Sequence, residues 1–82
     1  MMYLGQLLDT INNNELLIIR SSNERAITLV DEMPANELKR IITKEGRQRA
    51  VGDFYSDISE RNKSVSVTVV YVRNNGYLLT TE

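Results

Sequence analysis

The chain has 82 residues, ten of them basic and eleven acidic, which gives a formal net charge of −1. A chain of this length is expected to form one domain, residues 1–82, with a small core, and its near-neutral charge excludes attraction of the whole molecule to nucleic acid or to anionic membranes. Cysteine and histidine are both absent, which excludes disulfides, thiolate catalysis and the side chain that most often serves as general base or metal ligand.

An amphipathic helix is predicted near the N-terminus. Leu4, Leu7, Leu8 and Ile11 recur at the spacing of one helical face. The asparagines at residues 12–14 then end the helix, because asparagine bonds to local backbone and tolerates the left-handed conformation. We expect one of these asparagines to cap the C-terminus.

A β-hairpin is predicted next. Residues 16–19 are a continuous apolar run of strand length, residues 21–24 have the composition of a turn, and residues 25–30 alternate between two faces. We expect the two runs to pair as antiparallel strands.

A helix is predicted after this hairpin, over residues 35–45. Pro34 lacks the N–H that a strand ladder needs and suits the first turn of a helix. Leu38, Ile41 and Ile42 then recur at helical spacing, and Gly46 is the expected stop.

A further helix is predicted over residues 49–60, where Val51, Phe54, Tyr55 and Ile58 again have helical spacing. The alternative is that residues 47–55 are extended, because a glycine at position 52 disfavours a helix.

A second hairpin is predicted at the C-terminus. Polar and β-branched residues alternate over residues 64–73, and Asn75 with Gly76 favours a type I′ turn into residues 77–82. In this register Arg73 pairs with Leu78. The predicted fold is therefore α+β in the order α-β-β-α-α-β-β, a four-stranded antiparallel sheet with helices packed on one face.

Residues 69–72 are apolar on both faces of their strand. A chain this short is expected to have enough helices to cover one face only. The second face is then covered either by another molecule, which makes a homodimer through the sheet one expectation, or by the first hairpin folding over it.

A basic cluster is the first candidate site. Arg40, Lys44 and Arg47 follow helical spacing, with Lys39 and Arg49 beside them. Five cations in this window would neutralise several phosphates of a nucleic acid or contact an acidic protein surface. The alternative is an ordinary solvated helix face, since cations near a helix C-terminus complement its dipole.

An acidic group is the second candidate. Asp53, Asp57 and Glu60 are spaced for one face of a helix, where carboxylates would hold a hard cation such as Mg²⁺. No calcium-loop pattern accompanies them, so we expect a solvent-facing stripe and no metal. These carboxylates would also suit a basic surface on a partner or a second copy.

Aromatic residues are the third candidate. Tyr71 and Tyr77 flank the predicted turn, close to Arg73. Exposed tyrosines anchor protein interfaces or stack on bases. The alternative is that Tyr71 packs in the core, whereas Tyr77 is expected to be exposed.

The opening Met-Tyr-Leu helix, the asparagine-rich break, the hairpin and the Val-Asp-Glu-Met-Pro turn resemble small uncharacterised proteins of phages and prophages of Gram-positive bacteria. The resemblance covers about the first 45 residues, and residues 49–60 depart from it. Proteins of that kind are often host-takeover factors or inhibitors of bacterial defence, including anti-CRISPR proteins. The resemblance therefore implies an inhibitor that occludes a partner's surface.

We expect a non-enzymatic protein-binding module without a cofactor. A nucleic-acid-binding regulatory protein is the alternative. No signal pattern and no membrane-spanning apolar run is present, so we expect a cytoplasmic location. The candidate partner contacts are Arg40, Lys44, Arg47, Arg49, Tyr71, Arg73 and Tyr77.

Overall fold

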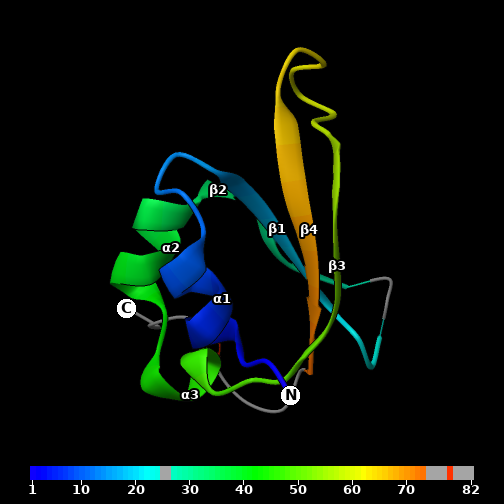
Figure 1. Cartoon of the computed structure of the whole chain (residues 1–82). Helices are drawn as coiled ribbons and strands as arrows, with labels where there is room; N and C mark the ends of the chain where they lie inside the picture. The colour runs from blue at the N-terminus through cyan, green and yellow to red at the C-terminus, as the bar shows by residue number, and fades with distance from the viewer. Residues whose placement is uncertain (25–26, 74–77, 79–82) are drawn as a thin grey trace.

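Three short helices and a four-stranded sheet make up the α+β fold seen in the computed structural model, which describes residues 1–24, 27–73 and 78. The helices lie to one side of the strands (Figure 1). In chain order the elements are α1 (Leu4–Thr10), β1 (Leu16–Ser21), β2 (Thr28–Pro34), α2 (Ala35–Ile41), α3 (Lys44–Arg47), β3 (Val51–Ile58) and β4 (Ser66–Val72).

The sheet is mixed, with the strand order β2-β1-β4-β3. β1 pairs with β2 and β3 pairs with β4 in antiparallel register, whereas the central pair, β1 and β4, is parallel. The first hairpin is therefore confirmed, and the prediction of a purely antiparallel sheet is wrong. The two central strands are the most apolar of the chain, as expected for strands buried on both faces.

The segment predicted as a helix over residues 49–60 forms β3, so that prediction is wrong and its extended alternative is closer. A helix could bury the same apolar residues, but the backbone N–H and C=O groups on one side of β4 would then lack hydrogen-bond partners. Gly52, Asp53, Ser56 and Asp57 are also poor helix formers. The order of helices and strands matches the predicted one only in type, because different segments form α3 and β3.

The helix predicted over residues 35–45 ends at Ile41, and Gly46 lies inside α3 and does not end a helix. The break falls at Ile42 and Thr43, both extended. The Thr43 hydroxyl accepts the Gly46 N–H at 2.9 Å and so caps the next turn. In α1 the C-cap is Ile11, in extended geometry, so the asparagine cap is also wrong.

The predicted C-terminal hairpin does not have β4 as its first strand, because β1 and β3 occupy both sides of β4. Leu78 lies away from Arg73, and its carbonyl oxygen accepts the Thr43 N–H at 3.0 Å. The predicted Asn75-Gly76 turn lies outside the described residues.

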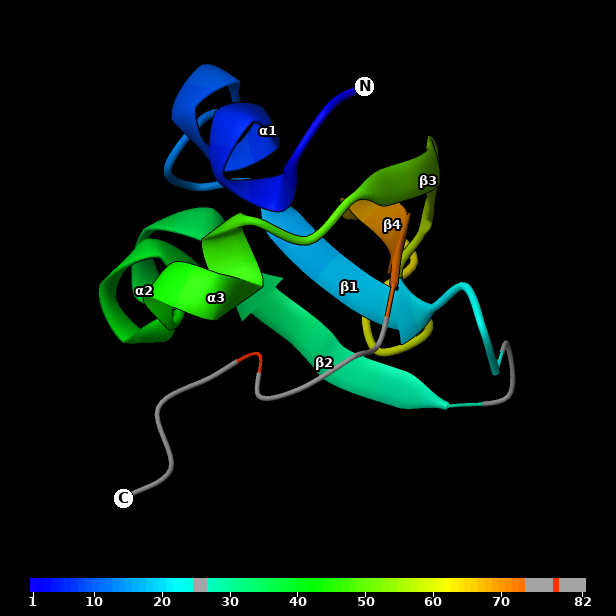
Figure 2. The ribbon, with the colours of Figure 1, turned by 90° about the horizontal axis from the view of Figure 1, so that it is seen from below.

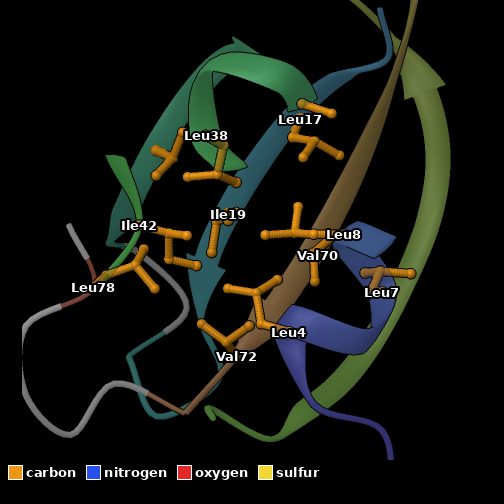
Figure 3. Packing of buried hydrophobic residues seen from close by; sticks show 12 residues of the cluster. Leu4, Leu7, Leu8, Leu17, Ile19, Leu38, Ile42, Val70, Val72 and Leu78 are labelled. Atoms are coloured by element: carbon orange, nitrogen blue, oxygen red, sulfur yellow. The ribbon is translucent and has the colours of Figure 1, made fainter. Parts of the chain in front are cut away.

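The larger hydrophobic core joins α1 and α2 to one face of the sheet (Figure 3). The spacing that predicted α1 is confirmed, because three of its leucines are buried. The cluster contains Leu4, Leu7, Leu8, Leu17, Ile19, Val30, Ala35, Leu38, Ile42, Val70, Val72 and Leu78.

A second, smaller core lies on the other face of the sheet. Val67, Val69 and Tyr71 are buried there, with Leu16 and Ile18 packed against them. We call this the second face. The apolar side chains of residues 69–72 are thus buried on both faces of β4 within one chain. Figure 2 shows the four strands side by side, with β2 and β3 at the two edges of the sheet.

Candidate functional site

The cations of the basic cluster predicted from the sequence differ in their surroundings in the structure. Arg40 and Lys44 are exposed on α2 and α3. Arg47 lies 3.7 Å from the Asp9 carboxylate and also donates to a backbone carbonyl of α2. The Lys39 ammonium donates to Asn13 at 2.8 Å. Two of these four cations therefore have partners within the chain, and the other two are exposed.

Arg49 and Arg73 are brought together at the start of β3. Arg49 is 4% exposed, and its Nη1 donates to the Arg73 carbonyl oxygen at 2.8 Å. Burial lowers the pKa of Arg49, and the negative charge of Glu45 partly opposes this. A pocket of about 310 Å³ lies beside them, with Tyr3 and Gln48 in its wall. Arg49 therefore holds two segments together from inside the molecule.

Tyr71 is 7% exposed and belongs to the second core, which leaves little of it for a partner. Its ring lies 6.4 Å from that of Tyr55 between centroids. The hydrogen bond with Tyr71 is the main cause that raises the pKa of Tyr55 above its usual value. Tyr77 lies outside the described residues.

The acidic group predicted on one helix face is arranged differently, because two of its members lie on a strand. Asp53 and Asp57 share the second-face side of β3, and Glu60 follows the strand. Within residues 1–24, 27–73 and 78, no three acidic side chains are grouped so as to hold a metal ion.

The feature that stands out in the structure is strand β3, which lies at the edge of the sheet. Seven of its eight residues are exposed. Seven large apolar side chains of the described residues are exposed, and all of these except Ile27 lie on or beside β3. The other six lie on β3 or on the N-terminal segment that pairs with its start: Met1, Met2, Tyr3, Phe54, Tyr55 and Ile58.

The backbone of β3 leaves hydrogen-bonding groups on its outer side. The Ser59 N–H donates to the Val65 carbonyl across the β3–β4 pair. The backbone N–H and C=O groups of the odd-numbered residues of β3 therefore point towards β4, and those of the even-numbered residues point outward. Phe54 and Ser56 accordingly direct N–H and C=O groups away from the sheet. The outward N–H of Ile58 donates to the carboxylate of Asp57 at 2.8 Å.

A bulge separates this open stretch from the covered start of the strand. Val51 pairs with Val72 and Asp53 with Tyr71, so Gly52 is the extra residue. Before the bulge, the Val51 N–H donates to the Met2 carbonyl at 2.9 Å. The N-terminal segment thus covers the start of β3, and the edge is open from the bulge onward.

A pocket of about 260 Å³ lies on the second face beside β3. We call it the acidic pocket. Its apolar side chains come from β1, β3 and β4, and its four carboxylates outnumber one guanidinium. It is lined by Ile18, Arg20, Asp31, Glu32, Tyr55, Asp57, Ile58, Glu60, Val67 and Val69.

The buried Ser59 hydroxyl holds the β3–β4 loop against β2 beside the acidic pocket. It donates to the Glu32 carboxylate at 2.5 Å and accepts the N–H groups of Arg61 and Asn62, each at 3.1 Å. Arg61 also forms an exposed ion pair with Asp31 at 2.7 Å. These contacts join the loop after β3 to a strand at the opposite edge of the sheet.

Glu32 reaches this position through a bulge in β2, where two residues oppose one on β1. Its φ of 47° lies in the left-handed region, which costs a non-glycine residue about 1 kcal/mol or more. The bond from Ser59 helps to offset that strain. Sequence reasoning did not identify Glu32 or Ser59, because the partners lie far apart in the chain.

The β3 side chains were recognised in the sequence but assigned to a helix. Val51, Phe54, Tyr55 and Ile58 match helical spacing, and the same segment is rich enough in aromatic and branched residues for a strand. That second signal is the one that would have found the edge.

Comparisons with protein-family models, with curated proteins and with solved structures find no match to this chain. In the part of the chain that the structure describes, no helix has the length and apolar character needed to cross a membrane.

Proposed function

We propose that this protein is a non-enzymatic protein-binding module that takes up an extended segment of another protein along the outer side of β3. The observation that carries the proposal is that β3, an edge strand, is exposed at seven of its eight residues. A long open edge with exposed Phe54, Tyr55 and Ile58 is a site for strand addition.

The outer edge of β3 provides both the backbone groups and the side chains that strand addition requires. The outward backbone groups of Phe54 and Ser56 would supply ladder hydrogen bonds, and their neighbours' side chains would supply contact area. The acidic pocket is smaller than the roughly 300–1,000 Å³ typical of small-molecule sites. Its size supports occupation by a single side chain of a protein partner.

Nucleic-acid binding by the basic cluster is the competing function. Arg40 and Lys44 remain exposed for it, whereas Arg47 and Arg49 are engaged within the chain. Association that depends on phosphate contacts is steeply weakened by salt. Retention on DNA or RNA at low salt, lost in an R40E/K44E variant, would favour this function.

The resemblance to phage proteins extends the proposal to the consequence of binding. A module of this size that covers a strand or edge of a bacterial protein would inhibit that protein by occlusion. The location that goes with this proposal is the bacterial cytoplasm.

Selection from a library of random peptides tests the proposal, with wild-type protein as bait. Ser56→Pro removes an outward N–H, and proline is tolerated at the outer side of an edge strand. Selected peptides are expected to lose binding to S56P and to keep it with the matched S56A and with R40E/K44E. Peptides that bind S56P and S56A equally would refute the β3 edge as the site.

A further inference from the structure

Charge on and around β3 indicates what kind of segment the edge accepts. Resting on the function proposed above, we infer that the partner segment alternates basic and apolar residues, with Lys or Arg side chains directed to the second face and into the acidic pocket.

The two faces of β3 differ in chemistry. Asp53, Tyr55 and Asp57 lie on the second-face side and Phe54 lies on the opposite side, whereas Ile58, at the end of the strand, also lines the acidic pocket. A strand added at about 4.8 Å from β3 would present alternate side chains to these two faces. One set therefore meets carboxylates and a phenol, and the other meets exposed apolar groups.

The acidic pocket continues the negative face beyond β3. Its four carboxylates belong to Asp31, Glu32, Asp57 and Glu60, against the single guanidinium of Arg20. The nearby cation of Arg61 is already paired with Asp31. A Lys or Arg on the added strand would extend over Asp57 towards this pocket, with its aliphatic stem on the apolar floor.

Asp57 also marks the point at which the partner enters. In the free protein its carboxylate accepts the outward N–H of Ile58 at 2.8 Å. A partner carbonyl would take over this N–H as the ladder extends. The released carboxylate would then pair with a cation of the incoming strand, which joins backbone recognition to charge recognition at one residue.

A second copy of this chain fits the edge less well than a basic segment. Antiparallel pairing of two β3 strands about a two-fold axis brings the Asp53 and Asp57 carboxylates of both copies to the same face of the joined sheet. A register centred on Tyr55 even sets Asp53 opposite the second copy's Asp57. Like charges so placed are destabilising, and charged side chains on an edge strand oppose self-association.

Three synthetic peptides of about the length of β3 test the inference, with ¹⁵N-labelled protein observed by NMR. The first alternates Lys with Val or Thr, the second has the same composition with all Lys in one block, and the third has Glu at each Lys position. The alternating Lys peptide is expected to shift the amide signals of Phe54 and Ser56. The other two are expected to bind at least tenfold more weakly.

Charge variants check the same inference from the protein's side. D57N/E60Q is expected to weaken binding of the alternating Lys peptide about two- to thirtyfold, the range that two exposed ion pairs supply. E60Q alone, at an exposed position outside the strands, guards against loss of folding, and E37Q on α2 is the matched control that should leave affinity unchanged. Circular dichroism verifies that each variant is folded.

The outcomes separate this inference from the proposed function. If the Glu peptide binds as well as the Lys peptide and shifts β3 amides, the basic partner is wrong and strand addition stands. If no peptide shifts the amide signals of Phe54 or Ser56, and the selected library peptides bind S56P as well as wild type, both the basic partner and strand addition at β3 are wrong. A concentration-dependent dimer in sedimentation that is lost in S56P would replace the basic segment by a second copy.

Discussion

Replacing Ser59 by alanine removes the contact that joins the β3–β4 loop to β2. The Ser59 hydroxyl makes three hydrogen bonds: one to the Glu32 carboxylate at 2.5 Å, and one each from the backbone N–H groups of Arg61 and Asn62. Ser59 is 1% exposed, so water does not reach its place freely. The alanine variant leaves all three partners without this oxygen.

The expected loss of stability follows from these bonds. A hydrogen bond to a charged group contributes about 1.5–3 kcal/mol, and loss of a capping hydroxyl for backbone N–H groups costs about 1 kcal/mol. Because Arg61 and Asn62 are exposed, water can partly replace their bonds. We therefore expect S59A to lower the free energy of unfolding by about 2–4 kcal/mol, a large share of the roughly 5–15 kcal/mol of a small domain.

Urea unfolding followed by circular dichroism measures this loss. With a slope of about 1–2 kcal/mol/M, the midpoint should fall by at least about 1 M. The control is S66A, at an exposed serine of β4 for which the described residues show no side-chain hydrogen bond. Glu32→Gln keeps an acceptor for Ser59 and should lose less than S59A. A loss in S59A within about 0.5 kcal/mol of S66A, the range of ordinary surface changes, would refute this account of the loop.

Two further predictions concern positions away from this loop. Gly46→Ala should lower the free energy of unfolding by about 1–3 kcal/mol, although alanine favours helices, because the added Cβ would collide with the Leu78 backbone oxygen. Gly52→Ala, whose Cβ would find its nearest neighbour at 3.8 Å, is the matched control in the same thermal or urea assay, and equal losses would contradict the packing argument. The raised pKa of Tyr55 means that the stability linked to this group is present below pH 10, the usual tyrosine value, and is lost as the pH rises through its folded-state pKa. Unfolding on either side of that pH should show a smaller alkaline loss in Tyr55→Phe than in wild type, and identical pH profiles would contradict it.

Local patterns in the sequence predict much of the molecule. The leucine spacing of α1, the paired runs of β1 and β2, and the place of Pro34 before α2 are all read from residues close together in the chain. The alternation that ends in Val72 likewise predicts β4. In each case a few neighbouring residues determine the local structure, because backbone preference and apolar periodicity agree.

Local sequence patterns predict only part of the candidate site. Asp53, Asp57 and Glu60 are predicted as an acidic group, but on a helix and without the carboxylates of β2. Four of the seven predicted partner contacts belong to the basic cluster, and two of these four, Arg47 and Arg49, have partners within the chain. The burial of Arg49 and its bond to the Arg73 carbonyl depend on a contact across 24 positions of the chain, which local patterns do not indicate.

The sequence by itself determined the α+β class, the first hairpin and a strand apolar on both faces. Tertiary structure decided the parallel pairing of β1 with β4, the identity of β3 as an edge strand and the joining of Ser59 to Glu32. The physical reason is that residues 51–58 fit a helix and a strand about equally well. Pairing with β4 resolves that ambiguity, because the backbone groups of a buried strand need partners on both sides.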